Sequence, residues 1–336
     1  MVSIVVVTQA ALLIARRAST WTVEEHLGGR SPDCVATDPR DPTRVYCGTA
    51  GAGLFRSRDR GRNWEPVGPG IEHGTITAVA VSHEERAHGF GIVCAGTEPS
   101  AVFRSDTGGD SWVELASLRA LPSADTWSFP PRPNTHHVRW IEADVSAVDR
   151  VFVAIEAGAL VRTFDGGRTW RDRVRGGPYD THTAVTHPLA LGRIYSAAGD
   201  GYFESTDAGD SRRSPKDGLK HRYLVGVAVD PADPDAVIVS ATDGPGSAYW
   251  PRRAKAYVYR RTDLKRWEQA MNGLPEAKGT TASRFTHAGE PGVIYAANNR
   301  GLFRSNDAGR SWKALDIPWP EPGLADGVEA LACLPD

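Results

Sequence analysis

Short hydrophobic runs alternate with polar turns along the whole chain. A representative stretch reads CVATD, RVYCG and GLFRS, followed by a polar turn and NWEPV. Strands of four to six residues that are rich in β-branched and aromatic side chains, separated by Asp-Pro and Gly turns, are typical of antiparallel sheets. The pattern therefore predicts repeated units of four antiparallel strands.

A polar phrase marks the same place in successive units. It reads SRDRGRNW at 57–64, TFDGGRTW at 163–170, STDAGDSR at 205–212 and SNDAGRSW at 305–312. In such a phrase the Asp carboxylate can accept backbone N–H groups of a tight turn, and the Gly supplies a positive φ or a close backbone approach. The closing Trp is expected to pack between neighbouring units and to bury roughly 150–250 Å². We interpret the phrase as the turn between the third and fourth strands of each unit.

Weaker copies of the phrase complete a set of seven units. SDTGGDSW at 105–112 has Thr107 in place of the Asp, TDLKRW at 262–267 is one residue short, and ARRASTW, which ends at Trp21, keeps only the position. The predicted units span 2–27, 33–70, 76–120, 137–176, 181–217, 223–272 and 281–317. The segment 327–334 has the pattern of an inner strand but belongs to none of these units.

The first unit lacks an inner strand, because the chain begins directly with the runs SIVVVTQ and ALLIAR. Pairing of 327–334 into that unit closes the ring and leaves no open sheet edge there. The sequence therefore predicts an all-β fold, a seven-bladed β-propeller that is a single domain over 1–336 and is closed by pairing of the C-terminal strand into blade one.

The repeated phrase resembles the Asp box of the BNR-repeat β-propellers, the sialidase-like group that also contains xyloglucanases and a photosystem assembly factor. The resemblance covers essentially the whole chain and implies the fold, but it implies no activity, because the Asp box is a turn. The Tyr/Phe-Arg-Ile-Pro segment of sialidases is absent. Arg139, Arg222 and Arg300 are candidates for the sialidase arginine triad by location alone. Xyloglucanases of this kind use two propellers with a cleft between them, whereas this chain has one.

The overall composition of the chain indicates which classes of partner and which cellular compartment to expect. The 336 residues include 39 basic and 41 acidic side chains, a formal net charge of −2, which favours no nucleic-acid partner. The four cysteines, Cys34, Cys47, Cys94 and Cys333, lie in predicted strands without any CxxC pair and are expected to be buried reduced thiols, which favours the cytoplasm. The apolar N-terminal run is shorter than the roughly 20 residues of a membrane span, so we expect no membrane partner. We expect a monomer.

Topology sorts the histidines between the two faces of the ring. In an up-and-down blade the first-to-second and third-to-fourth turns share one face, here called the turn face, because it carries the repeated phrases. The opposite face, here called the ligand face, carries the entries to the inner strands and the second-to-third turns. His83, His187 and His287 follow inner strands and are predicted to be exposed residues of the turn face. Five others precede or begin inner strands and are predicted to converge on the ligand face: His73, His136, His137, His182 and His221.

Polar residues also recur at one position of the inner strands. Counting back from the turn after each inner strand gives Asp33, Ala78, Arg139, His182, Val225, Ala282 and Glu329, and two residues earlier come His137, Asp180, Tyr223 and Thr280. Charged groups at a strand position that otherwise favours core residues predict a polar pocket on the axis. The second-to-third turns add Glu98, Glu156 and Asp200. The long loops 123–135 and 242–257, rich in Pro and aromatics, are predicted to be lids or partner sites.

These residues suggest an enzyme that acts on a small polar substrate in the axial pocket. A transition metal (Zn, Fe, Cu or Mn) is expected to be held there by His73, His136, His137, His182 and His221, with Asp180, Glu156, Arg139 and Tyr223 as catalytic or orienting groups. A first alternative is a glycoside hydrolase that uses two of the carboxylates Asp180, Asp200 and Glu156 on a glycan substrate. A second alternative is a non-catalytic glycan-binding or protein-assembly scaffold, whose histidines only hydrogen-bond a central water channel.

Overall fold

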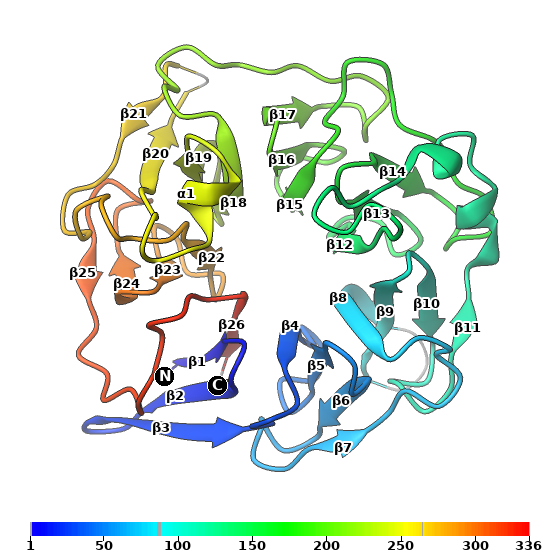
Figure 1. Ribbon diagram of the computed structural model, residues 1–336, viewed down its shortest axis with the longest axis horizontal. Coiled ribbons are helices and arrows are strands. Elements are labelled where there is room, and N and C mark those ends of the chain that lie inside the picture. The colour runs from blue at the N-terminus through cyan, green and yellow to red at the C-terminus, as the bar shows by residue number, and fades with distance from the viewer. Residues whose placement is uncertain (1, 86–88, 264, 336) are drawn as a thin grey trace.

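The computed structural model describes residues 2–85, 89–263 and 265–335. Within these ranges the strands form seven small antiparallel sheets arranged in a ring, with one edge strand of each sheet nearest the centre (Figure 1). This arrangement is the seven-bladed β-propeller predicted from the hydrophobic pattern.

The first three blades contain these strands. Blade one holds β26 (Ala330–Pro335), β1 (Val2–Val7), β2 (Leu12–Arg17) and β3 (Trp21–His26). Blade two holds β4 (Pro32–Thr37), β5 (Val45–Thr49), β6 (Leu54–Ser57) and β7 (Glu65–Pro66). Blade three holds β8 (Thr75–Glu85), β9 (Gly91–Glu98), β10 (Val102–Ser105) and β11 (Val113–Glu114).

The remaining blades follow in chain order. Blade four holds β12 (Val138–Ala143), β13 (Val151–Ile155) and β14 (Ala159–Thr163), and blade five holds β15 (Thr181–Thr186), β16 (Ile194–Ala198) and β17 (Gly201–Ser205). Blade six holds β18 (Tyr223–Asp230), β19 (Asp233–Thr242), β20 (Tyr257–Arg261) and β21 (Glu268–Gln269). Blade seven holds β22 (Arg284–Thr286), β23 (Ile294–Asn298), β24 (Gly301–Ser305) and β25 (Lys313–Ala314). In blades four and five a single bridge replaces the fourth strand, Arg162 to Arg171 and Glu204 to Arg213.

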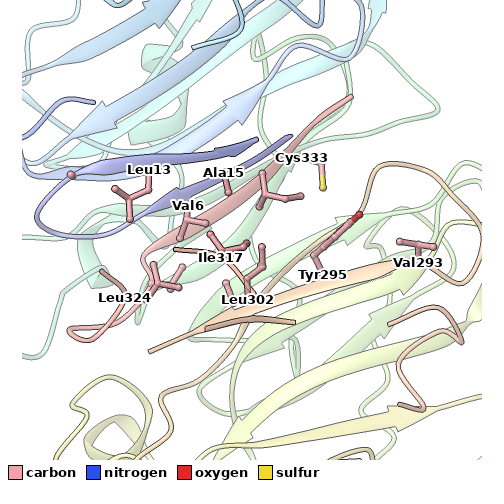
Figure 2. Close-up of a cluster of buried hydrophobic side chains, with 13 residues drawn as sticks. Val6, Leu13, Ala15, Val293, Tyr295, Leu302, Ile317, Leu324 and Cys333 are labelled. Carbon is pink, nitrogen blue, oxygen red and sulfur yellow. The ribbon is translucent and has the colours of Figure 1, made fainter. Parts of the chain in front are cut away.

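The ring closes through the two ends of the chain. β26 pairs antiparallel with β1, from Val2 opposite Pro335 to Val7 opposite Ala330, so that both termini lie in blade one (Figure 1). Beside this pairing, an apolar cluster joins blade one to blade seven, with Val6 and Leu13 on one side and Leu302 on the other (Figure 2). The predicted closure by the C-terminal strand is confirmed.

The repeated phrase forms the same turn in each full copy. In blade four, the N–H of Gly167 donates to Thr163 Oγ1 (2.9 Å), while the N–H and hydroxyl of Thr169 donate to the Asp165 carboxylate (2.9 and 2.6 Å). These bonds from Thr169 lower the pKa of Asp165 to about 2. In the copy that lacks the Asp, the Thr107 hydroxyl accepts the equivalent backbone bond, from Ser111 (2.9 Å). The carboxylate is therefore a turn-holding group, as predicted.

The tryptophans of the phrase join neighbouring blades. The indole N–H of Trp312 donates to the carbonyl of Ala270 in blade six (3.1 Å), and that of Trp267 donates to Pro215 in blade five (2.9 Å). The two rings are 6% and 1% exposed. Trp170 is half-buried against the apolar cluster of blades three and four. The predicted packing between units is thus deepest at Trp267 and Trp312.

Hydrogen bonds between turns fix which loops share a face. The N–H of Arg60 in a third-to-fourth turn donates to Thr43 in the first-to-second turn of the same blade (2.8 Å), and Ala308 donates to Gly292 in the same way (2.9 Å). His187 lies on this turn face, but the prediction that it is exposed is wrong. Its side chain is buried, because its Nε2 reaches the carbonyl of Asp230 in the next blade (2.9 Å).

Helical structure in the described residues is confined to short turns. They are α1 (Pro245–Ala248) in the 242–257 loop and two 3-10 turns over Ala116–Ala120 and Ala124–Thr126. None of these helical segments has the length and apolar character needed to cross a bilayer. All four cysteines are buried free thiols.

Candidate functional site

A bulge recurs near the ligand-face end of five inner strands. The ladder register shifts between Pro32 and Cys34 in β4, and at the equivalent point of β8, β12, β15 and β18. The residues at the shifts are Asp33, Thr77, Arg139, His182 and Val225. A bulge redirects a side chain and ends regular pairing. The predicted axial position therefore holds for Asp33, Arg139 and His182, whereas in blade three it falls on Thr77 and not on the buried Ala78.

Glu156, in the turn between β13 and β14, is held by two cationic or polar neighbours. Its Oε2 lies 2.8 Å from Nε2 of His137 and 3.2 Å from Nε of Arg139. Burial alone would raise the pKa of Glu156, but the bond from His137 and the charge of Arg139 outweigh burial and lower the pKa to about 2. Glu156 is therefore an ionised carboxylate at any physiological pH.

His182 is fully buried and has a defined ring orientation. Its Nδ1 lies 2.5 Å from the carbonyl oxygen of Leu224 in the next blade, and a carbonyl only accepts, so Nδ1 carries the hydrogen. Its Nε2 lies 3.3 Å from the Tyr223 hydroxyl and 3.5 Å from Oδ2 of Asp180. One ligand-type atom each from Glu156, Asp180 and His182 lie within 4.8 Å of one another.

The 242–257 loop contributes to this centre. Tyr249, which follows α1, presents its ring edge-on to His182 with the centroids 6.5 Å apart, and its ring lies 6.4 Å from that of Tyr223. The guanidinium of Arg284 lies 6.0 Å from the Tyr249 ring. The loop therefore reaches this centre from blade six.

Asp33 is the axial carboxyl with the opposite electrostatic environment to Glu156. Burial raises its pKa to about 6, opposed by Arg139 and reinforced by Glu329. Glu329 accepts a bond from Gln9 (3.1 Å) and lies 4.0 Å from Arg284. Sequence reasoning missed Arg284, although an arginine inside the inner strand of blade seven was a signal for it.

The predicted convergence of five histidines is wrong. His137 and His182 lie at the centre, but His221 stacks on Tyr257 (4.0 Å) and bonds the hydroxyl of Tyr259 (2.6 Å), both on β20. His73 lies against Phe103 of β10, and His136 packs edge-on against Trp127 (5.7 Å). His221 and His73 precede their inner strands and lie against the third strand of their own blade, away from the axis.

Two other predicted groups have positioning roles. Asp200 accepts the backbone N–H groups of Tyr179 (3.1 Å) and Asp180 (3.2 Å), so it supports the entry to β15. Glu98 accepts a bond from Arg132 (2.7 Å), whose guanidinium lies over the Phe129 ring. Phe129 in turn packs edge-on against His137 (4.8 Å). The 123–135 loop thus reaches the same centre as the 242–257 loop.

Over part of its length, the chain is similar in sequence to xyloglucanases. No family model matches the chain. The xyloglucanase Xgh74A of Acetivibrio thermocellus is 26% identical over 280 residues, which covers 69% of this chain and 31% of that protein. The chain thus spans about a third of the length of this relative.

Solved structures agree on the fold. An ancestral GH74 enzyme superposes with a TM-score of 0.63 at 15% identity, covering 90% of this chain and 38% of that one. YCF48 bound to D1 peptide superposes with a TM-score of 0.60 at 17% identity, covering 89% and 87%. At these identities the likeness establishes the propeller fold and leaves the Asp-box classification as a resemblance.

Proposed function

We propose that this protein is a glycoside hydrolase that acts on xyloglucan or a related polysaccharide at the ligand-face end of its axis. The similarity to a xyloglucanase supports the reaction class, which corresponds to the first alternative from the sequence. One observation carries the proposal: two carboxyl groups that both interact with Arg139 have pKa values displaced in opposite directions, to about 6 for Asp33 and about 2 for Glu156.

The displaced pKa values assign different roles to the two carboxyls. Glycoside hydrolysis needs one protonated carboxylic acid for the leaving oxygen and one ionised carboxylate as base or nucleophile. Asp33 retains its proton in mildly acidic solution, so it is the proton donor. Glu156 is ionised and is the base or nucleophile, with Asp180 beside it. Environments that separate the pKa values of two carboxyls in this way are how enzymes set acid and base roles.

Aromatic rings near the site provide surfaces for sugar rings. Tyr179 and Trp250 are large hydrophobic residues that remain 44% and 58% exposed, and both lie in ligand-face loops. Tyr179 directly precedes Asp180, and Trp250 directly follows Tyr249. Exposed aromatic faces beside convergent polar groups are the usual composition of a ligand site. We assign these two rings to substrate binding.

The proposal is tested by assaying release of reducing sugar from xyloglucan and from an unbranched β-glucan. Asp33→Asn and Glu156→Gln should each lower kcat/KM by about 10²–10⁴-fold, because each removes a proton-transfer or nucleophilic group. The matched control is Glu142→Gln. Burial raises the pKa of Glu142 to about 7, but its carboxylate accepts bonds from Thr186 (2.7 and 2.9 Å) near the turn-face end of β12. This control should retain activity.

Two outcomes would overturn the proposal. Folded wild-type protein that releases no sugar from either polysaccharide is not a hydrolase of this class, and if it still binds xyloglucan it is a non-catalytic glycan-binding protein. Full activity of both Asp33→Asn and Glu156→Gln would show that these two carboxyls on the axis do not carry out catalysis.

A further inference from the structure

We propose that Glu156, Asp180 and His182 form a binding site for one divalent transition-metal ion, with Zn²⁺ or Mn²⁺ as the matching ions. The inference concerns ion binding alone and does not depend on hydrolysis of a glycan. It replaces the predicted five-histidine site with one histidine and two carboxylates.

The three groups lie slightly farther apart than ligands around a single ion. Their ligand-type atoms all lie within 4.8 Å of one another. A Zn²⁺ ion binds nitrogen and carboxylate oxygen at about 2.0–2.2 Å, so ligand atoms on opposite sides of it are at most about 4.4 Å apart and tetrahedral neighbours are about 3.5 Å apart. Inward movement of the carboxylates completes the contacts. The side chain of His182 is 0% exposed, so the histidine ligand is already fixed in place.

His182 is oriented as a metal ligand usually is. Its Nδ1–H is committed to the Leu224 carbonyl, which leaves the lone pair of Nε2 directed to the centre. Metal-binding histidines typically donate their other N–H to a carbonyl or carboxylate, which fixes the tautomer. Without a cation, the Nε2 lone pair has the Tyr223 hydroxyl as a distant donor at 3.3 Å and also faces the acceptor oxygen of Asp180 at 3.5 Å. A divalent ion between Nε2 and Asp180 satisfies both.

Each of the two carboxylates also has one oxygen that the protein binds. The N–H of Ala157 donates to Oδ1 of Asp180 (3.0 Å), which directs Oδ2 toward His182. His137 and Arg139 contact Oε2 of Glu156, and in the proposed site Oε1 takes the ion. The two carboxylates carry two negative charges and Arg139 compensates one of them. The remaining negative charge favours a cation.

Gly199 permits the close approach of Asp180. A Cβ atom on Gly199 would collide with Oδ2 of Asp180 and would lie 3.0 Å from Cε2 of Tyr223. The turn between β16 and β17 therefore leaves room for this carboxylate only because residue 199 has no side chain. Gly199→Ala should displace the carboxylate while every ligand remains in the chain.

The donor set selects the class of ion. Imidazole suits Zn, Cu, Fe and Ni, whereas carboxylates suit Mg, Ca and Mn. One imidazole nitrogen with two carboxylate oxygens therefore favours Zn²⁺ or Mn²⁺ over Ca²⁺, which takes six to eight oxygens. Three protein ligands leave at least one coordination position open to water or substrate.

The test is calorimetric titration of chelator-treated full-length protein with Zn²⁺ and, separately, with Mn²⁺. We expect about one ion per chain, confirmed by elemental analysis after dialysis. His182→Gln should weaken binding by about 100-fold or more, since even supporting residues outside the ligand set cost 10–100-fold. Gly199→Ala should weaken it less. The matched control, His221→Gln, changes a histidine that is stacked on Tyr257 and should leave binding unchanged.

The inference is wrong if neither ion binds in a saturable way, or if His182→Gln and His221→Gln bind equally well. If His182→Gln does not fold, Asp180→Asn tests the same site, since the Asp180 side chain is 23% exposed and Asn keeps its volume. Ion binding is measured without polysaccharide. A protein that binds one ion but hydrolyses no glycan therefore contradicts only the proposed function. An active hydrolase without an ion contradicts only this inference.

Discussion

The two faces of the ring are built by opposite rules. On the turn face, different blades use equivalent residues for the same bonds, as at Thr163–Asp165 and at Ser305–Asp307, where the hydroxyl and carboxylate accept equivalent N–H groups. On the ligand face, one bulge position recurs but its residue changes from blade to blade, from Asp33 to Arg139 to His182. Repeated residues hold the blades in register, and varied residues at a repeated position form the site.

The largest expected effect is on stability, and it tests the repeated tryptophans that pack between blades. Trp267→Ala should cost about 3–5 kcal/mol of unfolding free energy, because it removes a ring that is 1% exposed and packs edge-on against Tyr202 of the preceding blade. Chemical denaturation at pH 7 measures it. Trp250→Ala, which removes a 58% exposed ring from the ligand face, is the control and should change stability little. Equal costs for the two variants would refute the assigned role of Trp267.

The same comparison explains what could be predicted from the sequence. The turns and strands are local, repeated patterns, so seven copies reinforce one another and the closure of β26 onto β1 follows from one missing strand. The bulge position could be counted in the same way, which located Asp33, Arg139 and His182. The contacts of these three residues with the charged groups around them could not be predicted from the sequence, because those contacts depend on side chains from other blades.

Most failures came from loop residues, and one came from a bulge within a strand. The direction of a loop residue is not set by its distance from a strand, so His73 and His221 were placed toward the axis although they contact β10 and β20. A slip of one residue moved the expected position from Thr77 to Ala78 in blade three. The contact of Tyr249 with His182 could not be predicted, because the sequence of a long loop does not show which of its side chains reaches the axis.

A smaller effect on stability tests Asp33, one of the residues that vary from blade to blade at the bulge. The pKa of Asp33 is raised by burial to about 6, above the ordinary value of about 3.9, so between these pH values the folded protein binds more protons than the unfolded chain. Stability from this group is complete below pH ~4 and falls as the pH rises through 6. Asp33→Asn should therefore be more stable than wild type at pH 7, by about 2–3 kcal/mol at most.

Thermal unfolding of both proteins between pH 4 and pH 8 measures this difference. The gain should vanish near pH 4, and the more stable variant should have lost glycan hydrolysis. If Asp33→Asn is less stable than wild type at pH 7, the carboxylate is stabilised by Arg139 more than it is penalised by burial, and its assignment as proton donor fails.

The smallest expected effect returns to the turn face. The pKa of Asp165 is lowered to about 2 by bonds from Thr169, so its contribution is present above pH ~4 and is lost as the pH falls from 4 through 2. Because the carboxylate is exposed and screened, Asp165→Asn should lower the thermal midpoint at pH 6 by about 2 °C or less, and the difference should disappear at pH 2. Thr107→Asp, which restores the Asp to the copy in blade three, should add a pH dependence of the same sign. If neither substitution alters the pH profile of unfolding, the repeated carboxylate is not what holds these turns.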